Sequence, residues 1–404
     1  MNPIVELEST YCAHNYHPLP IVLVKGEGPY VWDDAGNKYL DMMSAYSAVS
    51  HGHAHPRLVD TLSRQAATLS IVSRAFHTDK LAAFLERACQ LTGQDMALPM
   101  NTGAEAVETA IKASRKWAYT VKGVLGDAEV IACEGNFHGR TTTLVGLSSD
   151  PQYREGFGPF PPGLTTIPYG DAAALERAIT PNTAAFLVEP IQGEGGIVIP
   201  PDGYLAQCAE ICRSKNVLLI CDEVQTGLGR TGKLLASDYE SVRPDGLVLG
   251  KALGGGMLPV SMFLAKREVM DVFKPGDHGS TFGGNPLAAT VGLEALNIIV
   301  EDELAQQSAE LGTHMLDGLR NIANSLVTEI RGRGLFIGME IDPDKVSARA
   351  VCERLMQRGV LSKETHETVV RFAPPLIITR DEINWALRRI QAVLDDMEKL
   401  AVAS

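Results

Sequence analysis

Short, almost uninterrupted apolar runs alternate with segments of helical periodicity through the first three quarters of the chain. The runs at 129–133, 184–189 and 217–222 are typical of strands that are buried on both faces of a sheet. The segments 104–119 and 204–214 instead repeat their apolar residues at the spacing of an α-helix. Strands that alternate with helices in this way predict an α/β fold with a mostly parallel central sheet.

The pattern changes after a long helical stretch at about 286–325. The rest of the chain predicts a smaller α/β unit, with strands near 327–331, 335–341 and 369–373 and helices at 347–358 and 381–400. The hairpin-like segment 28–40 is expected to join this unit. The predicted organisation is a large domain at 45–290 and a small domain formed by 1–44 and 291–404.

Two apolar runs lead into residues that can carry out chemistry. The run 218–221 is followed by Asp222, and the run 246–249 is followed by Lys251 in a glycine-rich segment. Functional groups of a parallel sheet gather at the carboxyl ends of its strands, so both side chains are expected at one site. A lysine amine can form an imine with an aldehyde, and an aspartate can keep a pyridine nitrogen protonated. Pyridoxal 5'-phosphate enzymes need these two groups.

Each of these residues has a simpler explanation when it is taken alone. Taken alone, Asp222 is more typical of a helix cap, and Lys251 of a surface charge. Their joint placement at the ends of two apolar runs favours the cofactor site.

The segment Asn101-Thr102-Gly103-Ala104 opens the helix at 104–119 and provides what a phosphate requires. Gly103 allows a close approach, Thr102 can cap the helix, and the helix N-terminus attracts an anion. Many helices begin in this way without binding anything, so the segment gains weight only from the acid and the lysine. Phe137 is a candidate to stack on the pyridine ring and Gln225 to bind the ring hydroxyl. A core aromatic and a solvated amide are the respective alternatives.

Two further motifs resemble binding sites but are better explained otherwise. The segment 227–233 matches a dinucleotide-binding G-x-G-x-x-G and most of a Walker motif, but Leu234 stands where a magnesium-binding hydroxyl belongs. An acid-bearing segment also separates its glycines from the strand, so a structured loop beside the cofactor is expected. The alternating histidines of 51–55 lack a fourth metal ligand in sequence, which favours a capped turn and no metal site.

Composition excludes several classes of protein. A net charge of −13 and a pI near 5.3, without a basic run, disfavour nucleic acid or an anionic membrane as a partner. The acidic N-terminal residues are not signal-like, and no apolar stretch approaches the roughly 18 residues of a membrane span. A cytoplasmic location is therefore expected. Seven cysteines without a C-x-x-C pair indicate reduced thiols.

These motifs together resemble the class III (ω-) aminotransferases of PLP fold type I, and within that family the members that act on ornithine. The resemblance covers almost the whole chain. It is carried by the segments 15–20, 46–53, 101–103, 137–141, 188–194, 222–225, Lys251, 278–286 and 370–375.

The resemblance implies an activity, an assembly and a set of site residues. The reaction is L-ornithine with 2-oxoglutarate, giving L-glutamate 5-semialdehyde and L-glutamate. The assembly is a homodimer or a higher even oligomer, with Thr281 reaching the cofactor phosphate of the neighbouring subunit. Lys251 and Asp222 are the expected catalytic residues. The expected cofactor-binding residues are Thr102, Gly103, Ala104, Phe137, Asp222, Val224, Gln225, Lys251, Ser280 and Thr281.

The expected substrate residues are Tyr16, Tyr46, Arg140, Glu194 and Arg371. Planar arginines suit carboxylates. The resemblance implies that Arg371 binds the α-carboxylate of 2-oxoglutarate or glutamate, and that Glu194 neutralises Arg371 when ornithine enters. Acetylornithine and 4-aminobutyrate aminotransferases share the whole cofactor set and stay open as alternatives. From a different class, a nucleotide-binding regulatory module built on 227–233 also stays open.

Overall fold

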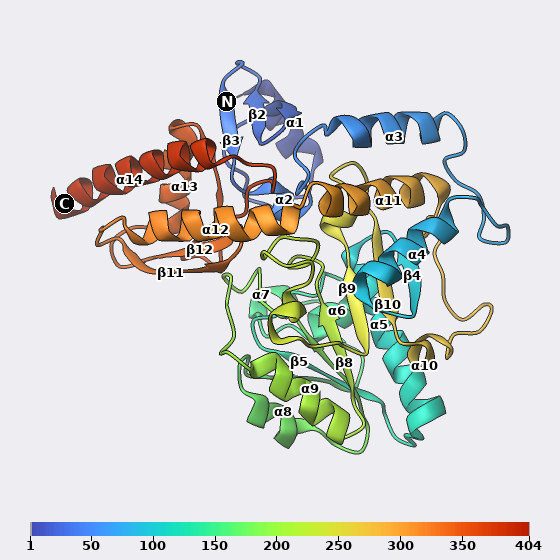
Figure 1. The fold of residues 1–404 in the computed structure, drawn as a ribbon. Helices are drawn as coiled ribbons and strands as arrows, with labels where there is room; N and C mark the ends of the chain where they lie inside the picture. The colour runs from blue at the N-terminus through green and yellow to red at the C-terminus, as the bar shows by residue number, and fades with distance from the viewer. Residues whose placement is uncertain (1, 404) are drawn as a thin grey trace.

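The computed structural model describes residues 2–403 and is built around a seven-stranded sheet of order β4-β10-β9-β8-β7-β5-β6 (Figure 1). Strands β6, β5, β7, β8 and β9 run parallel, whereas β10 is antiparallel to both β9 and β4. The mostly parallel sheet predicted from the apolar runs is confirmed. The strands are β4 (Met96–Met100), β5 (Glu129–Cys133), β6 (Leu164–Ile167), β7 (Thr183–Val188), β8 (Leu218–Asp222), β9 (Gly246–Leu249) and β10 (Ser261–Ala265).

Both faces of this sheet are covered, which explains why its strands read as continuous apolar runs. In β8, Leu219 and Cys221 belong to one hydrophobic cluster, and Leu218 and Ile220 belong to another on the opposite face. The surrounding helices are α3 (Pro56–Ala66), α4 (Leu81–Thr92), α5 (Gly103–Trp117), α6 (Thr142–Gly146), α7 (Pro151–Arg154), α8 (Ala172–Ala178), α9 (Tyr204–Ser214), α10 (Arg267–Met270) and α11 (Pro286–Glu301).

The C-terminal part forms a smaller unit that includes the N-terminal segment. Its two four-stranded sheets have the orders β11-β12-β15-β14 and β1-β2-β3-β13. Strand β13 pairs in parallel with β3, with Val360 opposite Leu40, so an N-terminal and a C-terminal segment of the chain share one sheet (Figure 1). The predicted domain limits themselves stay a prediction. The elements are α1 (Pro3–Tyr11), β1 (Leu23–Glu27), β2 (Tyr30–Asp33), β3 (Lys38–Asp41), α12 (Leu304–Arg320), β11 (Val327–Arg333), β12 (Phe336–Ile341), α13 (Ala348–Gln357), β13 (Val360–Leu361), β14 (Lys363–Thr365), β15 (Val369–Phe372) and α14 (Arg380–Ala403).

The long helical stretch predicted at 286–325 is two helices. It breaks at Glu303, whose φ of 51° lies in the left-handed region, so α12 starts as a separate helix.

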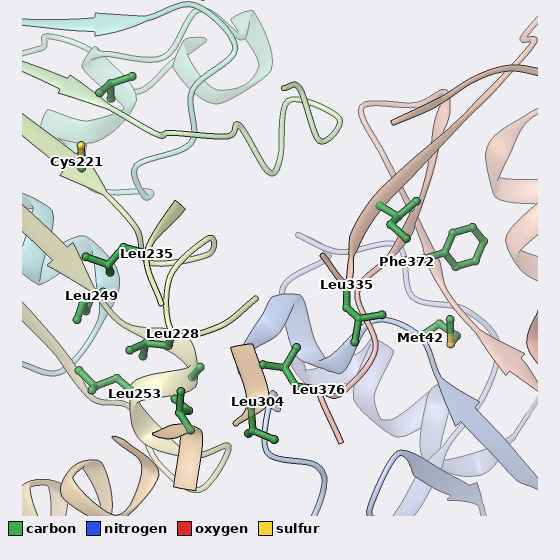
Figure 2. Close-up of a cluster of buried hydrophobic side chains, with 14 of the residues drawn as sticks. Met42, Cys221, Leu228, Leu235, Leu249, Leu253, Leu304, Leu335, Phe372 and Leu376 are labelled. Atoms are coloured by element: carbon green, nitrogen blue, oxygen red, sulfur yellow. The ribbon is translucent and has the colours of Figure 1, made fainter. Parts of the chain in front are cut away.

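A single hydrophobic cluster connects the two units (Figure 2). It extends from Cys221 and Leu249 on the central sheet to Leu335 and Phe372 of the smaller unit, and all four side chains are buried. Because this core is continuous, the smaller unit is held against the carboxyl ends of β8 and β9.

The short segment α2 (Ser44–Ser47) has an unusual backbone. Its four residues have φ values of 42°, 47°, 58° and 75°, although none of them is glycine. Such conformations cost roughly 1–2 kcal/mol per residue, so neighbouring groups must hold them in place. The carboxylate of Asp41 accepts hydrogen bonds from the amides of Met43 (2.8 Å) and Ser44 (2.9 Å).

Arg230 holds the same segment from the other side. Its fully buried guanidinium donates to Ser44 Oγ (3.3 Å) and Ser50 Oγ (3.0 Å), and to the carbonyls of Leu335 (2.9 Å) and Pro374 (2.6 Å). Burial lowers the pKa of Arg230 to about 9, and the charge of Asp41 opposes that shift. The loop at 227–233 therefore places Arg230 where three segments of the chain meet, namely those that contain Ser44, Leu335 and Pro374.

Candidate active site

The site lies where β8 and β9 end. Asp222 is the last residue of β8, and Lys251 follows β9 after one glycine. Both side chains line a cavity of about 350 Å³, here called the inner cavity. Burial lowers the pKa of Lys251 to about 8, so the neutral, nucleophilic amine forms at a lower pH than usual.

Asp222 is held rigidly at the bottom of the inner cavity. Its Oδ1 accepts a hydrogen bond from the amide of Val224 (3.1 Å), and its Oδ2 accepts one from Nδ1 of His138 (2.7 Å). Burial by itself lowers the pKa of His138, but the hydrogen bond and charge of Asp222 more than offset burial and raise it. His138 and Asp222 are only 4% and 5% exposed, so this charge-assisted pair is shielded from water.

Glu189 adds a second buried carboxyl group. It accepts hydrogen bonds from the amides of Phe137 (3.0 Å) and Gly193 (3.4 Å), and so joins two of the loops that line the site. Burial raises the pKa of Glu189 to about 7, with His138 acting in the opposite direction.

The other end of the inner cavity is suited to an anion. Thr102 caps α5 through a capping box with Glu105, in which Glu105 accepts from the amide of Thr102 (2.8 Å). Within residues 2–403, the next two amides, those of Gly103 and Ala104, donate no hydrogen bond to a protein acceptor. Both residues line the cavity. Free amides at a helix N-terminus are a site for a phosphate group.

The residues of the inner cavity fit pyridoxal 5'-phosphate on the chemistry of the donor set. An anion-binding helix end, an aliphatic wall at Val224, an aromatic side chain at Phe137, a carboxylate and an amine all face one space. Gly103 suits this shape, because a Cβ there would lie 3.1 Å from Cγ1 of Val224 and would press on that side chain. The structure brings together the predicted residues Thr102, Gly103, Ala104, Phe137, Asp222, Val224, Gln225, Lys251 and Arg140.

Glu194 and Arg371 form the centre of the predicted substrate end. Nη1 of Arg371 lies 2.8 Å from Oε1 of Glu194, and Nε2 of Gln225 donates to the same oxygen over 3.1 Å. Although burial raises the pKa of Glu194, the charge of Arg371 and its hydrogen bond lower it to about 2 overall. The side-chain amide of Gln225, predicted to bind the ring hydroxyl of the cofactor, thus donates a hydrogen bond to Glu194 in this structure.

Tyr46, from the left-handed segment, lies beside this pair. The guanidinium carbon of Arg371 is 5.2 Å from the centre of the Tyr46 ring, within the range of a cation–π contact. Burial, followed by the charge of Glu194, raises the pKa of Tyr46. The other predicted tyrosine, Tyr16, is 74% exposed in a segment without regular structure.

Arg140 is placed by two aromatic rings. Its guanidinium carbon lies 3.8 Å from the ring centre of Tyr153 and 5.1 Å from that of Phe137. Tyr153 and Glu194 both line a wider cavity of about 730 Å³, here called the outer cavity. The outer cavity adjoins the inner one through the Arg140–Tyr153 and Gln225–Glu194 contacts.

Ser280 and Thr281 are not among the residues that line the inner cavity. Ser280 Oγ accepts a hydrogen bond from Nδ2 of Asn101 (2.8 Å), which brings their loop next to the start of α5, and Thr281 is exposed. Within one chain, Thr281 does not join the other predicted phosphate ligands.

His138, Tyr153 and Thr365 were not predicted as members of the site, and Glu189 was expected at the carboxyl end of its strand without an assigned role. His138 lies next to the predicted Phe137, and Glu189 directly follows the last residue of β7, near where Asp222 ends β8, so a signal existed for both. Tyr153 and Thr365 gave no such signal, because their contacts cross from one loop or strand to another.

The two motifs that were set aside have structural roles. Arg230, from the nucleotide-like loop at 227–233, is buried and donates hydrogen bonds to the carbonyls of Leu335 and Pro374. His51 Nε2 bonds to the carbonyl of Ala295 (3.0 Å), and His53 Nε2 lies 2.8 Å from Asp41. The described part of the chain contains no cluster of three or more His, Cys, Asp or Glu residues suited to a metal.

Comparisons with known proteins agree with this geometry. The family model for aminotransferase class-III matches residues 11–394. The ornithine aminotransferase of Geobacillus sp. (strain WCH70) is 56% identical over 391 residues, which are 96% of this chain and 98% of that protein.

Two solved structures show the same fold. Ornithine aminotransferase from Toxoplasma gondii, which has PLP at partial occupancy in its active site, aligns with a TM-score of 0.97 at 46% identity. That alignment covers 98% of this chain and 95% of the other. Acetylornithine aminotransferase from Elizabethkingia anophelis aligns with a TM-score of 0.89 at 45% identity, over 97% and 98% of the two chains. With a family match over almost its whole length, this chain belongs to the class-III aminotransferases and has their PLP fold type I.

Proposed function

We propose that this chain is a PLP-dependent ornithine δ-aminotransferase. It would transfer the terminal amino group of L-ornithine to 2-oxoglutarate and release L-glutamate 5-semialdehyde and L-glutamate. The observation that carries the proposal is the Glu194–Arg371 ion pair beside Tyr46, because a pair that stays closed for ornithine and opens for 2-oxoglutarate would let one site accept both substrates. Relatives at 56% identity that are ornithine aminotransferases support the same substrate.

Different residues of the inner cavity would bind and act on different parts of the cofactor. When bound, pyridoxal phosphate supplies an aldehyde that carries the amino group and a ring that accepts electrons. Gly103 and Ala104 would hold its phosphate, and Asp222 would hold a proton on its ring nitrogen. Lys251 would anchor it and then move a proton to and from the substrate carbon, which suits an amine whose pKa is about 8.

The substrate end would distinguish the two substrates by charge. With Glu194 on Arg371, the arginine is neutralised, so the α-carboxylate of ornithine is directed to Arg140 and Tyr16 instead. Tyr46 offers a hydroxyl to the α-ammonium. When 2-oxoglutarate enters, Glu194 would have to leave Arg371, which then binds the α-carboxylate.

An amino-donor panel with 2-oxoglutarate tests the proposal. L-ornithine, N-acetylornithine and 4-aminobutyrate are compared by kcat/KM, with glutamate formation as the readout. The proposal requires ornithine to be the best donor, and a preference for N-acetylornithine would overturn it. The likeness to an acetylornithine aminotransferase makes that donor the sharpest comparison.

We also propose a homodimer, or a higher even oligomer, in which Thr281 acts across the interface. The exposure of Thr281 and the exposed Phe282 beside it support this arrangement. Mixed dimers of Thr281→Ala and Lys251→Ala subunits test it. If Thr281 acts across the interface, one site is intact and about half of the wild-type activity remains. If it serves its own subunit, only the activity of a Thr281→Ala site remains.

A cytoplasmic location is proposed from the acidic composition and the unpaired thiols. Among the described residues, no helix is long and apolar enough to cross a membrane. Fractionation of the producing cells tests the location, and enrichment outside the soluble fraction would contradict it.

A further inference from the structure

Glu194 stands on a short loop that is closed upon itself. The amide of Gln192 donates to the carbonyl of Val198 (3.2 Å), and the amide of Val198 donates back to the carbonyl of Gln192 (2.9 Å). Inside this closure the amide of Ile197 donates to the carbonyl of Gly193 (3.1 Å). The loop is therefore a compact turn with one acidic side chain.

The backbone of this turn is held in an unfavourable conformation. Ile197 is fully buried with a φ of 56°, in the left-handed region that a β-branched residue rarely adopts. Strain of this kind costs roughly 1–3 kcal/mol and persists only where surrounding groups enforce it. An anchor for Ile197 must therefore exist.

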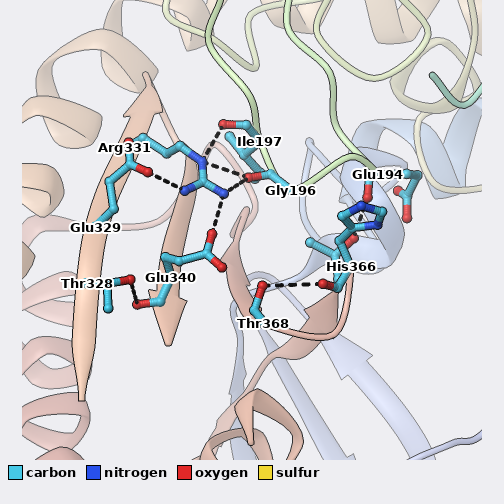
Figure 3. Close-up of polar contacts among 10 residues, drawn as sticks. Glu194, Gly196, Ile197, Thr328, Glu329, Arg331, Glu340, His366 and Thr368 are labelled. Atoms are coloured by element: carbon cyan, nitrogen blue, oxygen red, sulfur yellow. Dashed lines mark hydrogen bonds and ion pairs between the residues drawn. The ribbon is translucent and has the colours of Figure 1, made fainter. Parts of the chain in front are cut away.

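Arg331, on strand β11 of the smaller unit, provides that anchor (Figure 3). Its Nε donates to the carbonyls of Gly196 (3.0 Å) and Ile197 (3.2 Å), and its Nη2 donates to Gly196 again (2.7 Å). Glu329 (2.7 Å) and Glu340 (2.8 Å) accept from the rest of the guanidinium, as Figure 3 shows. The planar fork thus fixes both carbonyls at once.

The fit of Arg331 depends on the glycine that it touches. A Cβ on Gly196 would lie 3.2 Å from Nη2 of Arg331 and 3.2 Å from Cγ2 of Val369. The φ of Gly196 is +106°, which side chains other than glycine rarely adopt.

A second tie holds Glu194 from the substrate side. The hydroxyl of Thr365 donates to the carbonyl of Glu194 (2.9 Å) and accepts from Nη2 of Arg371 (2.9 Å). The backbone from the carbonyl of Glu194 to the carbonyl of Ile197 is thus attached to the smaller unit. Release of Arg371 by Glu194 is then a rotation of the side chain about a fixed backbone.

We infer that Arg331 is a positioning residue that sets the strength of the Glu194–Arg371 pair and thereby the choice between the two substrates. The inference rests on the proposed function, since it assigns a role within that site. Without Arg331, the strain at Ile197 can relax and move the carboxylate of Glu194 away from Arg371. The charge of Arg371 is then less well neutralised by Glu194, which strengthens the binding of dicarboxylates and weakens the binding of ornithine.

The test compares Arg331→Met with three other variants in the full-length holoenzyme. Arg331→Lys keeps one charged donor and is expected to retain part of the wild-type preference for ornithine that Arg331→Met loses. Gly196→Ala disturbs the same contact from the loop side. Arg333→Met is the matched control, because Arg333 is also on β11 and reaches across to Asp202 (3.2 Å) without touching the loop.

Two half-reactions and one binding measurement are the readouts. For Arg331→Met and Gly196→Ala, we expect KM for ornithine to rise about three- to tenfold and KM for 2-oxoglutarate to fall or stay unchanged. Glutarate, a dicarboxylate without an amine, should bind several-fold more tightly by calorimetry. Arg333→Met should change neither KM. Equal losses for both substrates, or no change in glutarate affinity, would overturn the inference.

A double variant separates a positioning role from a general structural one. If Arg331 acts through Glu194, then Arg331→Met should add little to the KM changes already caused by Glu194→Gln. Additive effects would show that Arg331 acts elsewhere. Failure of the proposed function has a different result, namely a wild-type enzyme that does not use ornithine while glutarate affinity still responds to Arg331→Met.

Discussion

His138 donates a hydrogen bond from Nδ1 to Oδ2 of Asp222 across 2.7 Å, and both residues are buried. The other ring nitrogen of His138 is buried without a hydrogen-bond partner among the described residues. The imidazole therefore serves Asp222 alone and fixes the direction of its carboxylate.

We expect His138→Gln to lower kcat about tenfold or more, because the loss of a hydrogen bond to a buried charge costs roughly 1.5–3 kcal/mol. KM for ornithine should change little, since His138 lies away from the substrate end. Steady-state kinetics of His138→Gln and of Asp222→Asn check this. A His138→Gln enzyme with normal kcat would contradict the role.

Lys251→Ala should abolish turnover and leave the protein folded, since Lys251 lines a cavity and its removal breaks no hydrogen bond of the core. The visible absorbance of bound cofactor should also be lost after dialysis. Spectra and thermal unfolding of the variant check both statements. If colour survives dialysis, a different lysine anchors the cofactor.

The rate at which cofactor-free protein captures pyridoxal phosphate should rise with pH and level off above about 8. The reason is that the pKa of Lys251 is lowered to about 8, and only the neutral amine attacks an aldehyde. Stopped-flow absorbance at a series of pH values measures this. A rate that continues to rise toward the ordinary lysine pKa, near 10.5, would show that burial does not act on this amine.

Glu189 should make the cofactor-free protein less stable as pH rises. Its folded-state pKa of about 7 lies above the ordinary 4.5, so the folded protein holds the proton more tightly than the unfolded chain. Its stabilising effect is complete below the ordinary value and is lost, by about 3 kcal/mol, as pH rises through 7.

The matched variant is Glu189→Gln, which cannot titrate. Denaturant unfolding between pH 4.5 and 8 should show a flatter stability curve for it than for the wild type. His138, whose pKa is also raised, contributes a loss in the same direction, so His138→Gln is measured in parallel. Identical slopes in wild type and Glu189→Gln would refute the assignment.

Tyr46→Ile should depress the use of ornithine about ten- to a hundredfold and raise the relative use of 4-aminobutyrate, which has no α-amine. The glutamate half-reaction should be preserved, because Arg371 keeps its other partners. A donor panel of the variant measures this. An equal loss for all donors would mean that Tyr46 only lines the pocket.

The position of a site residue could be predicted from the sequence where the apolar pattern of a single strand marks it. Asp222 and Lys251 follow strands buried on both faces, so local pattern placed them at one edge of the sheet. Strand β4 was not predicted, because it contains Pro99, which local rules exclude from most strands. The structure places β4 at the edge of the sheet, where a proline is tolerated.

The contacts that hold the site residues in place could not be predicted from local sequence patterns. His138 and Asp222 are separated by 84 residues, and Arg331 lies 135 residues from Gly196. No periodicity reports on which side chain will meet which carbonyl across that distance. The left-handed backbone of Ser44–Ser47 was also invisible, since none of its residues is a glycine.

That left-handed segment has a consequence for how this enzyme family can diversify. Asp41 and Arg230 hold its conformation through hydrogen bonds with Ser44, and these bonds do not involve the Tyr46 side chain. Residue 46 can therefore be exchanged while the backbone that presents it stays where it is. Under the role proposed for Tyr46, one substitution at residue 46 shifts donor preference without a change in the backbone that presents it.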